Sequence, residues 1–559
     1  MSEKQSSLSP SGFDYVVAVT QDSINGTLEE FLYNGLPEVI ICYIYDESTP
    51  PNLVPTDYAA LVASANNTDP FSVPDGTSGR DPRVQDLADA GFAFAVKAQL
   101  GLPPGVSPAD LPPIVTLKPG QSNVTYTMMF AEFVAAEITY GPRNSVTWFN
   151  QSQPPGTSWT FSGAVDLNFA EKAFTCLPPD VQKRLKDIGD PDMFSVKQLY
   201  YDLNSSDLVQ SFQFDKIPSN SALNGFMTDD FVDTYFKNLK GAEILGYSAQ
   251  QMSATPPSSI AVTDVNFFTP DPVGGQGAPA TLNYLCAANN DALPDTTHAG
   301  FGWNWIEPGE VSQYDGVAAL NRNTLARYLN SAVLPDGSTL FSYAARNCYL
   351  PSVTVTYEGG IELKVNYQFG ATPGQAPTVS YPPSGGTILS YSYDSGDVSD
   401  QAGLNGDMGK MDLHSTFNMT VSVQGNEIVI VQHLVIWTYV RYLATDDSGN
   451  VVDKQITDTY TVGVDDTGQI TATLKSSVPV DNSQQPGANG FLNFWANVQS
   501  LSDAVAGWAR SFASTNLTDV PVSFVQNFVF PGGSTFSFTD ASFSDNQDLV
   551  SHITYADVS

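Results

Sequence analysis

The hydrophobic positions of residues 15–32 predict a short strand followed directly by an amphipathic helix. The run YVVAV at Tyr15–Val19 is rich in the β-branched residues that strands favour. Thr20 or Asp22 is placed to cap the helix, and Gly35 is placed to end it. Apolar residues then recur at the spacing of one helix face, namely Ile24, Leu28, Phe31 and Leu32.

The same pattern returns in the second half of the chain. Val317-Ala318-Ala319 leads into a helix that Asn321 is placed to cap, and Leu325, Leu329 and Val333 form its apolar stripe. A second repeated motif, T-D-x-x-F, occurs inside the alternating stretches 260–268 and 536–544. The recurring order predicts two similar modules, and the alternative is that strand–helix phrases recur by chance in a large α+β chain.

Long alternating stretches predict β-hairpins in the second half, with turns at 359–360, 425–426 and 465–468. The strand expected at Ile428–Leu443 is apolar on both faces, so it needs cover on both faces. Amphipathic helices predicted at about 228–240 and 491–512 would supply such cover.

We therefore expect an α+β, β-rich fold of two tandem modules in an elongated body. Each module is predicted to be a long curled antiparallel sheet wrapped around an amphipathic helix, and its interior can form an apolar tunnel. A chain of 559 residues is too long for one ordinary core, which agrees with this division. The predicted parts are a polar tail at 1–12, a first module at 13–268, a Pro/Gly-rich linker at 269–279 and a second module at 280–559.

Charge narrows the possible partners. Fifty-nine acidic residues against 23 basic ones give a net charge of −36. This charge repels phosphate backbones and anionic lipid surfaces, so we expect no nucleic-acid partner. Simple solubility is a sufficient reason for the acidic composition.

The compartment is predicted from cysteines and apolar runs. The four cysteines lie far apart, beside apolar residues and without zinc spacing, so buried free thiols in a reducing compartment are expected. The longest apolar runs are too short or too polar for a membrane span. The first residues, MSEKQSSLSPSG, lack the apolar core of a signal peptide, so we expect a cytoplasmic protein, with leaderless secretion as the alternative.

Several phrases of the chain resemble the tubular lipid-binding (TULIP) superfamily. They are GFDYVVAVTQDSINGTLEEFL, FSVKQLYYDLNSSDLVQSF, GFGWNWIEPGEVSQYDGVAALNRNTLARYL and NFVFPGGSTFSFTDASFSDNQDLVSHITYA. They look similar to an intracellular microbial branch that includes accessory proteins encoded beside clostridial neurotoxins. The resemblance implies two TULIP-like modules that bind lipid or another apolar molecule, and it implies no catalysis.

Three other groups of residues have both a chemical and a structural interpretation. The four histidines lie apart, and His433, inside the apolar strand, is expected to be a hydrogen-bonded structural residue. Phe301, Trp303 and Trp305 alternate as on one strand face near Glu307 and Glu310, which could suit a glycan site but is expected to be core followed by a turn. The acidic stretch 394–412 could bind calcium, although it lacks EF-hand spacing and is more typical of an acidic loop.

The leading hypothesis is a non-enzymatic protein that binds lipid or another apolar small molecule in an internal tunnel, without a cofactor or metal. The alternatives are a protein-interaction scaffold, such as a toxin-cluster accessory protein, and an enzyme acting on glycan or lipid. A filled, dry core is the competing interpretation of the expected pocket residues. These residues are Ile24, Leu28, Phe31, Trp303, Trp305, Leu325 and Leu329.

Overall fold

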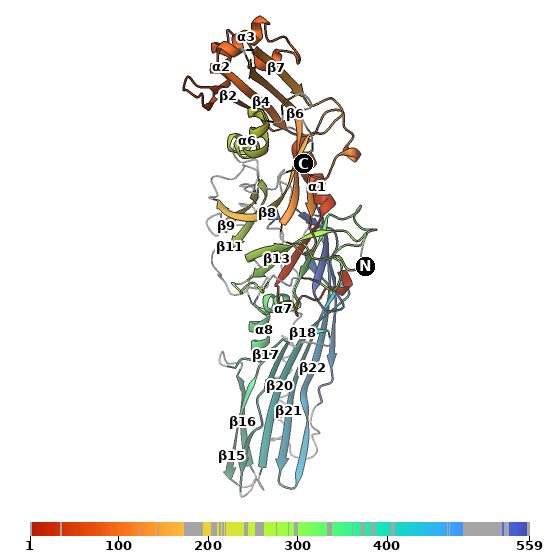
Figure 1. The fold of residues 1–559 in the computed structure, drawn as a ribbon. Coiled ribbons are helices and arrows are strands. Elements are labelled where there is room, and N and C mark those ends of the chain that lie inside the picture. The colour runs from red at the N-terminus through yellow and green to blue at the C-terminus, as the bar shows by residue number, and fades with distance from the viewer. Residues whose placement is uncertain are drawn as a thin grey trace.

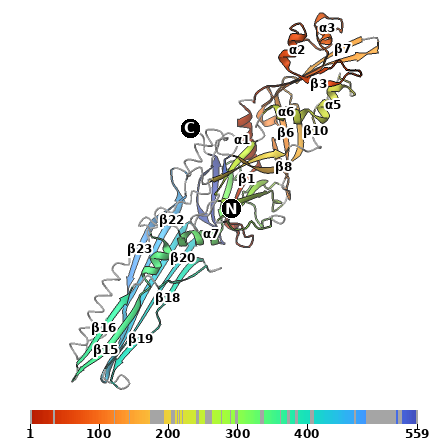
Figure 2. The same cartoon turned by 90° about the vertical axis from the view of Figure 1, so that its left-hand side faces the viewer.

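A computed structural model shows the protein as a long, narrow body (Figures 1 and 2). Helices α2 (Tyr58–Ser64) and α3 (Pro82–Asp89) lie at one end, and long hairpins of the second half reach the other. The structure describes residues 3–555 except 34–35, 122, 143–144, 173–193, 203–208, 212–213, 215–216, 219, 240–243, 252–261, 275–276, 289, 296–299, 332–337, 360–361, 371–374, 382–385, 404–408, 467, 469, 485–527 and 530–535.

The fold is α+β and β-rich, which confirms the predicted class. Strands dominate the described part, and every strand pair recorded there is antiparallel. The strands form a central sheet and one large sheet on each side of it, together with a separate hairpin.

The central sheet contains both of the strands that open the repeated phrases. Its order is β12-β13-β1-β14-β27-β25, and β26 also pairs with β27. The members are β1 (Tyr15–Thr20), β12 (Val262–Phe268), β13 (Thr281–Ala288), β14 (Gly316–Leu320), β25 (Phe536–Phe538), β26 (Ser542–Phe543) and β27 (Leu549–Tyr555).

The two opening strands pair with each other. In the β1–β14 register, Val17 lies opposite Ala318 and Ala18 lies opposite Val317. When Val17 is aligned with Val317 and Ala18 with Ala318, the pair Val17–Ala318 maps onto the pair Val317–Ala18. A local two-fold axis between the two strands relates the pairs in this way. This register agrees with the prediction of two related modules. The relation between the modules stays a prediction.

The stretch 269–279, predicted to be a linker, connects β12 with β13, and these two strands pair along their length. Strand β13 pairs with β1, as β27 pairs with β14. A boundary after β13 would therefore give the two halves matching strands in the central sheet.

The first half carries a large sheet of order β24-β11-β9-β8-β6-β4-β2-β3. Strand β10 pairs with β8, while β5 and β7 pair with the long strand β6. The bounds are β2 (Val39–Tyr45), β3 (Leu53–Thr56), β4 (Phe92–Leu100), β5 (Val115–Leu117), β6 (Asn123–Gly141), β7 (Ser145–Ser152), β8 (Thr160–Lys172), β9 (Phe194–Asp202), β10 (Val209–Gln210), β11 (Ile244–Gln251) and β24 (Phe528–Val529).

The second half carries a sheet of order β17-β18-β20-β21-β22-β23, with β19 on β20 and a separate β15–β16 hairpin. The predicted hairpin turn at 425–426 is confirmed, because β20 and β21 pair along their whole length on either side of it. The bounds are β15 (Leu350–Gly359), β16 (Glu362–Gly370), β17 (Thr378–Ser380), β18 (Thr387–Asp394), β19 (Val398–Ala402), β20 (Gly409–Gln424), β21 (Glu427–Tyr442), β22 (Thr445–Val464) and β23 (Ile470–Asp481).

Helices follow the two opening strands as predicted. Thr20 Oγ1 accepts a hydrogen bond from the Ser23 backbone N–H at the start of α1, and Asn321 Oδ1 accepts one from the Asn323 N–H at the start of α7. The helix predicted at 491–512 lies outside the described residues. The helices not yet given are α1 (Gln21–Tyr33), α5 (Ala222–Asp229), α6 (Phe231–Leu239), α7 (Arg322–Ser331) and α8 (Leu340–Arg346), with short 3-10 turns at Glu3–Gln5, Pro70–Ser72 and Pro108–Asp110.

One large hydrophobic cluster extends through both halves. It takes in buried side chains of α1, α7 and one face of the central sheet, and it continues over β4, β6 and the inner faces of β20, β21 and β22. A second cluster covers the opposite face of the central sheet, and a third lies under α2 and α3. The expected free thiols are confirmed for Cys42, Cys286 and Cys348, which are buried, while Cys176 lies outside the described residues.

Candidate functional site

The predicted ligand residues of the two helices share one environment. Ile24 and Leu28 of α1 are buried in the large cluster, as are Leu325 and Leu329 of α7. The side chain of Phe31 lies outside the described part. These positions are consistent with either an apolar binding surface or a filled core.

The two predicted tryptophans lie elsewhere. Trp305 is buried in the second cluster and Trp303 packs against it, across the central sheet from the helix residues. The separation follows from strand alternation, because Val17 of β1 belongs to the large cluster and Val16 to the second one. Ile24, Leu28, Leu325 and Leu329 therefore lie on one side of the central sheet, and Trp303 and Trp305 lie on the other.

The segment around the tryptophans differs from the expected strand. Residues 301–313 form bends and turns, and the rings of Phe301, Trp303 and Trp305 pack together with centroids 5.0–5.4 Å apart. Glu310 Oε2 accepts a hydrogen bond from the Glu307 backbone N–H, so this carboxylate helps to close its own turn. The three aromatic side chains therefore pack on one another in a turn, and they do not alternate along a strand as the sequence suggested.

The inner face of the second-half sheet combines apolar and polar side chains. Strand β21 alternates strictly, with one face buried and the other half-buried, so the cover expected on both faces is complete on one face and partial on the other. The sequence signal was blurred because the half-buried face also carries valines and aromatic residues. Gln432 and Thr438 interrupt the buried face, and both are fully inaccessible.

Gln432 has an unusual environment for an amide. It lies opposite Met419 of β20 and Ile456 of β22, and Ile430 and Leu434 flank it on the same face. Neither its nitrogen nor its oxygen has a hydrogen-bond partner in the described part of the chain. A buried amide without partners costs about 1–3 kcal/mol, so this position is a candidate contact for a polar group of a bound molecule.

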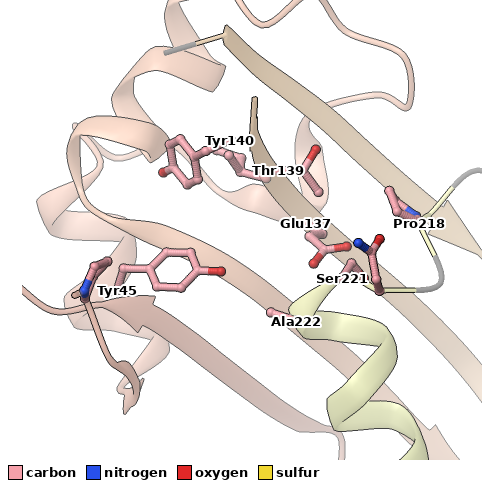
Figure 3. A pocket seen from close by; sticks show the side chains of 10 residues that line it. Tyr45, Glu137, Thr139, Tyr140, Pro218, Ser221 and Ala222 are labelled. Carbon is pink, nitrogen blue, oxygen red and sulfur yellow. The ribbon is translucent and has the colours of Figure 1, made fainter. Parts of the chain in front are cut away.

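A separate pocket of about 670 Å³ lies where β2, β6 and the start of α5 meet (Figure 3). Glu137 is only 1% exposed, and its Oε1 accepts a hydrogen bond from the Leu223 N–H at 3.0 Å. Burial raises the pKa of Glu137, and the N–H groups at the helix start offset part of this effect. The residues around the pocket are Tyr45, Pro51, Glu137, Ile138, Thr139, Tyr140, Pro218, Asn220, Ser221 and Ala222.

Sequence reasoning missed this pocket. Its parts come from three stretches far apart in the chain, represented by Tyr45, Glu137 and Ser221. One local signal was present, namely a lone glutamate inside the apolar run FVAAEITY. A carboxylate in such a run needs a partner when it is buried, so Glu137 could have been singled out.

His433 and His414 both contact carboxylates in the second half. His433 Nε2 lies 2.8 Å from Asp453 Oδ1, as expected for a hydrogen-bonded structural histidine. His414 lies between Asp394 and Asp397, with a ring nitrogen 2.8 Å from an oxygen of each. Within the described part of 394–412 and the rest of the described chain, no group of three or more potential ligands could hold a metal ion.

Comparisons with known proteins give distant matches. No family model and no curated protein sequence matches the chain. The solved structure of P47 from Clostridium botulinum A2 aligns over 97% of this chain and 97% of its own, with a TM-score of 0.41 and 9% identity. A lipopolysaccharide binding protein aligns over 98% of this chain and 100% of its own, with a TM-score of 0.26 and 10% identity. Scores and identities this low do not establish a family.

Among the helices that the structure describes, none combines the length and the apolar character needed to cross a membrane.

Proposed function

We propose that the protein is a non-enzymatic carrier that holds a lipid or another apolar molecule against the inner face of β20, β21 and β22. The large cluster supports this role, because its buried apolar side chains extend through both halves of the body and over the inner faces of these strands. Burial of an apolar chain there would contribute ~25 cal/mol per Å² before the entropic costs of binding.

The observation that carries the proposal is the unpartnered amide of Gln432. An amide surrounded by Met419, Ile430, Leu434 and Ile456 costs stability unless something satisfies it. A lipid with an ester, hydroxyl or headgroup oxygen can accept from its nitrogen while the acyl chain contacts the apolar neighbours. The ligand class is therefore an amphiphile with a hydrogen-bonding group. A tunnel around this ligand, and a location in the cytoplasm, belong to the same proposal.

Photo-cross-linking tests the assignment. The full-length protein is incubated with a fatty acid that carries a diazirine in its chain, irradiated, digested and analysed by peptide mass spectrometry. We expect adducts on the inner faces of 411–423 and 428–442. Absence of adducts, or adducts confined to exposed peptides such as the one containing Tyr357, contradicts the proposal.

A further inference from the structure

The pocket at the end of β6 joins a buried carboxylate to two aromatic rings (Figure 3). The rings of Tyr45 and Tyr140 lie with centroids 6.0 Å apart at an angle of 71°. Glu137 and Tyr140 both line the pocket from β6, and the charge of Glu137 is close enough to Tyr45 to affect that phenol. None of the described residues around the pocket is basic.

Glu137 uses only one of its oxygens in a hydrogen bond of good geometry. Oε1 accepts from the Leu223 N–H in the first turn of α5, where Ser221 is the N-cap residue. Oε2 is buried and has no such partner in the described part of the chain. The Ser221 hydroxyl and the Ala222 N–H also act on this carboxyl and lower its pKa, but a buried carboxylate oxygen without a well-formed hydrogen bond is costly.

The two tyrosines supply surfaces that attract a cation. Burial raises the pKa of Tyr140 to about 12, and burial followed by the charge of Glu137 raises the pKa of Tyr45, so both phenols are neutral at physiological pH. Neutral aromatic rings attract cations placed over their faces. The Tyr140 hydroxyl donates to the Phe92 carbonyl oxygen at 3.2 Å, which fixes the ring while leaving it 47% exposed to an entering ligand.

We propose that this pocket binds a small primary amine in its ammonium form, with an ammonium N–H donating to Glu137 Oε2 and the alkyl part lying against Tyr45 and Tyr140. The ammonium group supplies both the missing donor and the missing positive charge. Pro218 and Ala222 offer apolar contacts to the carbon chain. This activity goes beyond the proposed lipid binding, and it rests on residues of a different sheet.

The competing explanation is that Glu137 serves only to cap α5. The substitution Glu137→Gln separates the two roles, because glutamine keeps a carbonyl oxygen for the Leu223 N–H and removes the charge. Glu47→Gln is the matched control, since Glu47 is an exposed residue two positions after Tyr45 and its loss changes the net charge equally.

Isothermal titration calorimetry on the full-length protein uses n-butylammonium as the probe, with n-butanol as its neutral counterpart and tetramethylammonium as a cation without N–H groups. The wild type is expected to bind n-butylammonium saturably, tetramethylammonium more weakly and n-butanol not at all. Glu137→Gln is expected to weaken n-butylammonium binding about tenfold or more, and Glu47→Gln is expected to leave it unchanged.

Absence of saturable n-butylammonium binding by the wild type overturns the proposal, as does equal affinity in Glu137→Gln. Tetramethylammonium binding as tight as n-butylammonium binding overturns the assigned hydrogen bond. If Glu137→Gln does not fold, Tyr45→Leu replaces it with an expected several-fold loss, and unchanged affinity in that variant overturns the site. None of these results depends on cross-linking at β20–β22, so the two proposals fail separately.

Discussion

Val17 and Ala318 lie directly opposite each other in the adjacent antiparallel strands β1 and β14, with both side chains in the large hydrophobic cluster. The next pair, Ala18 and Val317, has the same residue types with the strands exchanged, and it faces the second cluster. A large residue thus meets a small one on each face. A two-fold relation between the repeated phrases, which stays a prediction, would produce this complementarity.

The pairing predicts that side-chain volume lost at Val17 can be restored at Ala318 on the neighbouring strand. Val17 is 1% exposed, so Val17→Ala is expected to lower the free energy of unfolding by about 2 kcal/mol. The double variant Val17→Ala/Ala318→Val restores the lost volume, so it is expected to recover part of that loss. Urea unfolding followed by fluorescence measures both changes. A double variant that is as destabilised as the sum of the two single variants contradicts the shared packing site.

Much of the local structure could be predicted from the sequence. The β-branched run at Tyr15–Val19 and the capping residues Thr20 and Asn321 predicted the opening strands and helices, because these signals act within a few residues. The turn at Gly425 was predictable for the same reason, because a glycine follows a regular alternation in the sequence. In the structure this glycine has a φ of +62°, which glycine adopts readily.

Features that depend on distant residues could not be predicted in this way. Proline and glycine in 269–279 mark a chain reversal between paired strands as readily as a flexible linker. Alternation at Phe301–Trp305 suggested a strand, but three rings packed on each other favour a turn. The Glu137 pocket exists only because the ends of two strands meet the start of a helix.

The buried amide at β21 gives a prediction with two distinguishable outcomes. Gln432→Met has a similar shape without the polar atoms. If the amide contacts a ligand, this variant is expected to retain less co-purified lipid than the wild type. Gln424→Met, the same substitution at an exposed position of β20, is the matched control and is expected to retain lipid normally. Lipid content is measured by mass spectrometry of organic extracts.

The opposite result for Gln432→Met has a clear physical meaning. In a dry, filled core, removing an unsatisfied amide stabilises the protein by about 1–3 kcal/mol and leaves the lipid content unchanged. That combination would contradict the assigned role of Gln432.

The imidazole of His414 gives a pH-dependent prediction. Burial alone lowers the pKa of His414, but its hydrogen bond to Asp397 and the charge of Asp394 outweigh this effect and raise the pKa above its ordinary value. The ion pairs therefore contribute to stability below the ordinary histidine pKa, and the contribution is lost as pH rises through the raised pKa. Asp397→Asn is expected to lower the pKa of His414 in an NMR titration, whereas Asp110→Asn, at an exposed and distant carboxylate, is expected to leave it unchanged. No change in Asp397→Asn would show that the contact does not set this pKa.

Native mass spectrometry of the full-length protein, purified without detergent from two unrelated hosts, tests the central claim most directly. A carrier with an amphiphile on its inner face is expected to appear with an added mass that is released on denaturation and is identified as lipid. Observation of the unliganded mass alone from both hosts, with no lipid in organic extracts, would contradict the carrier function.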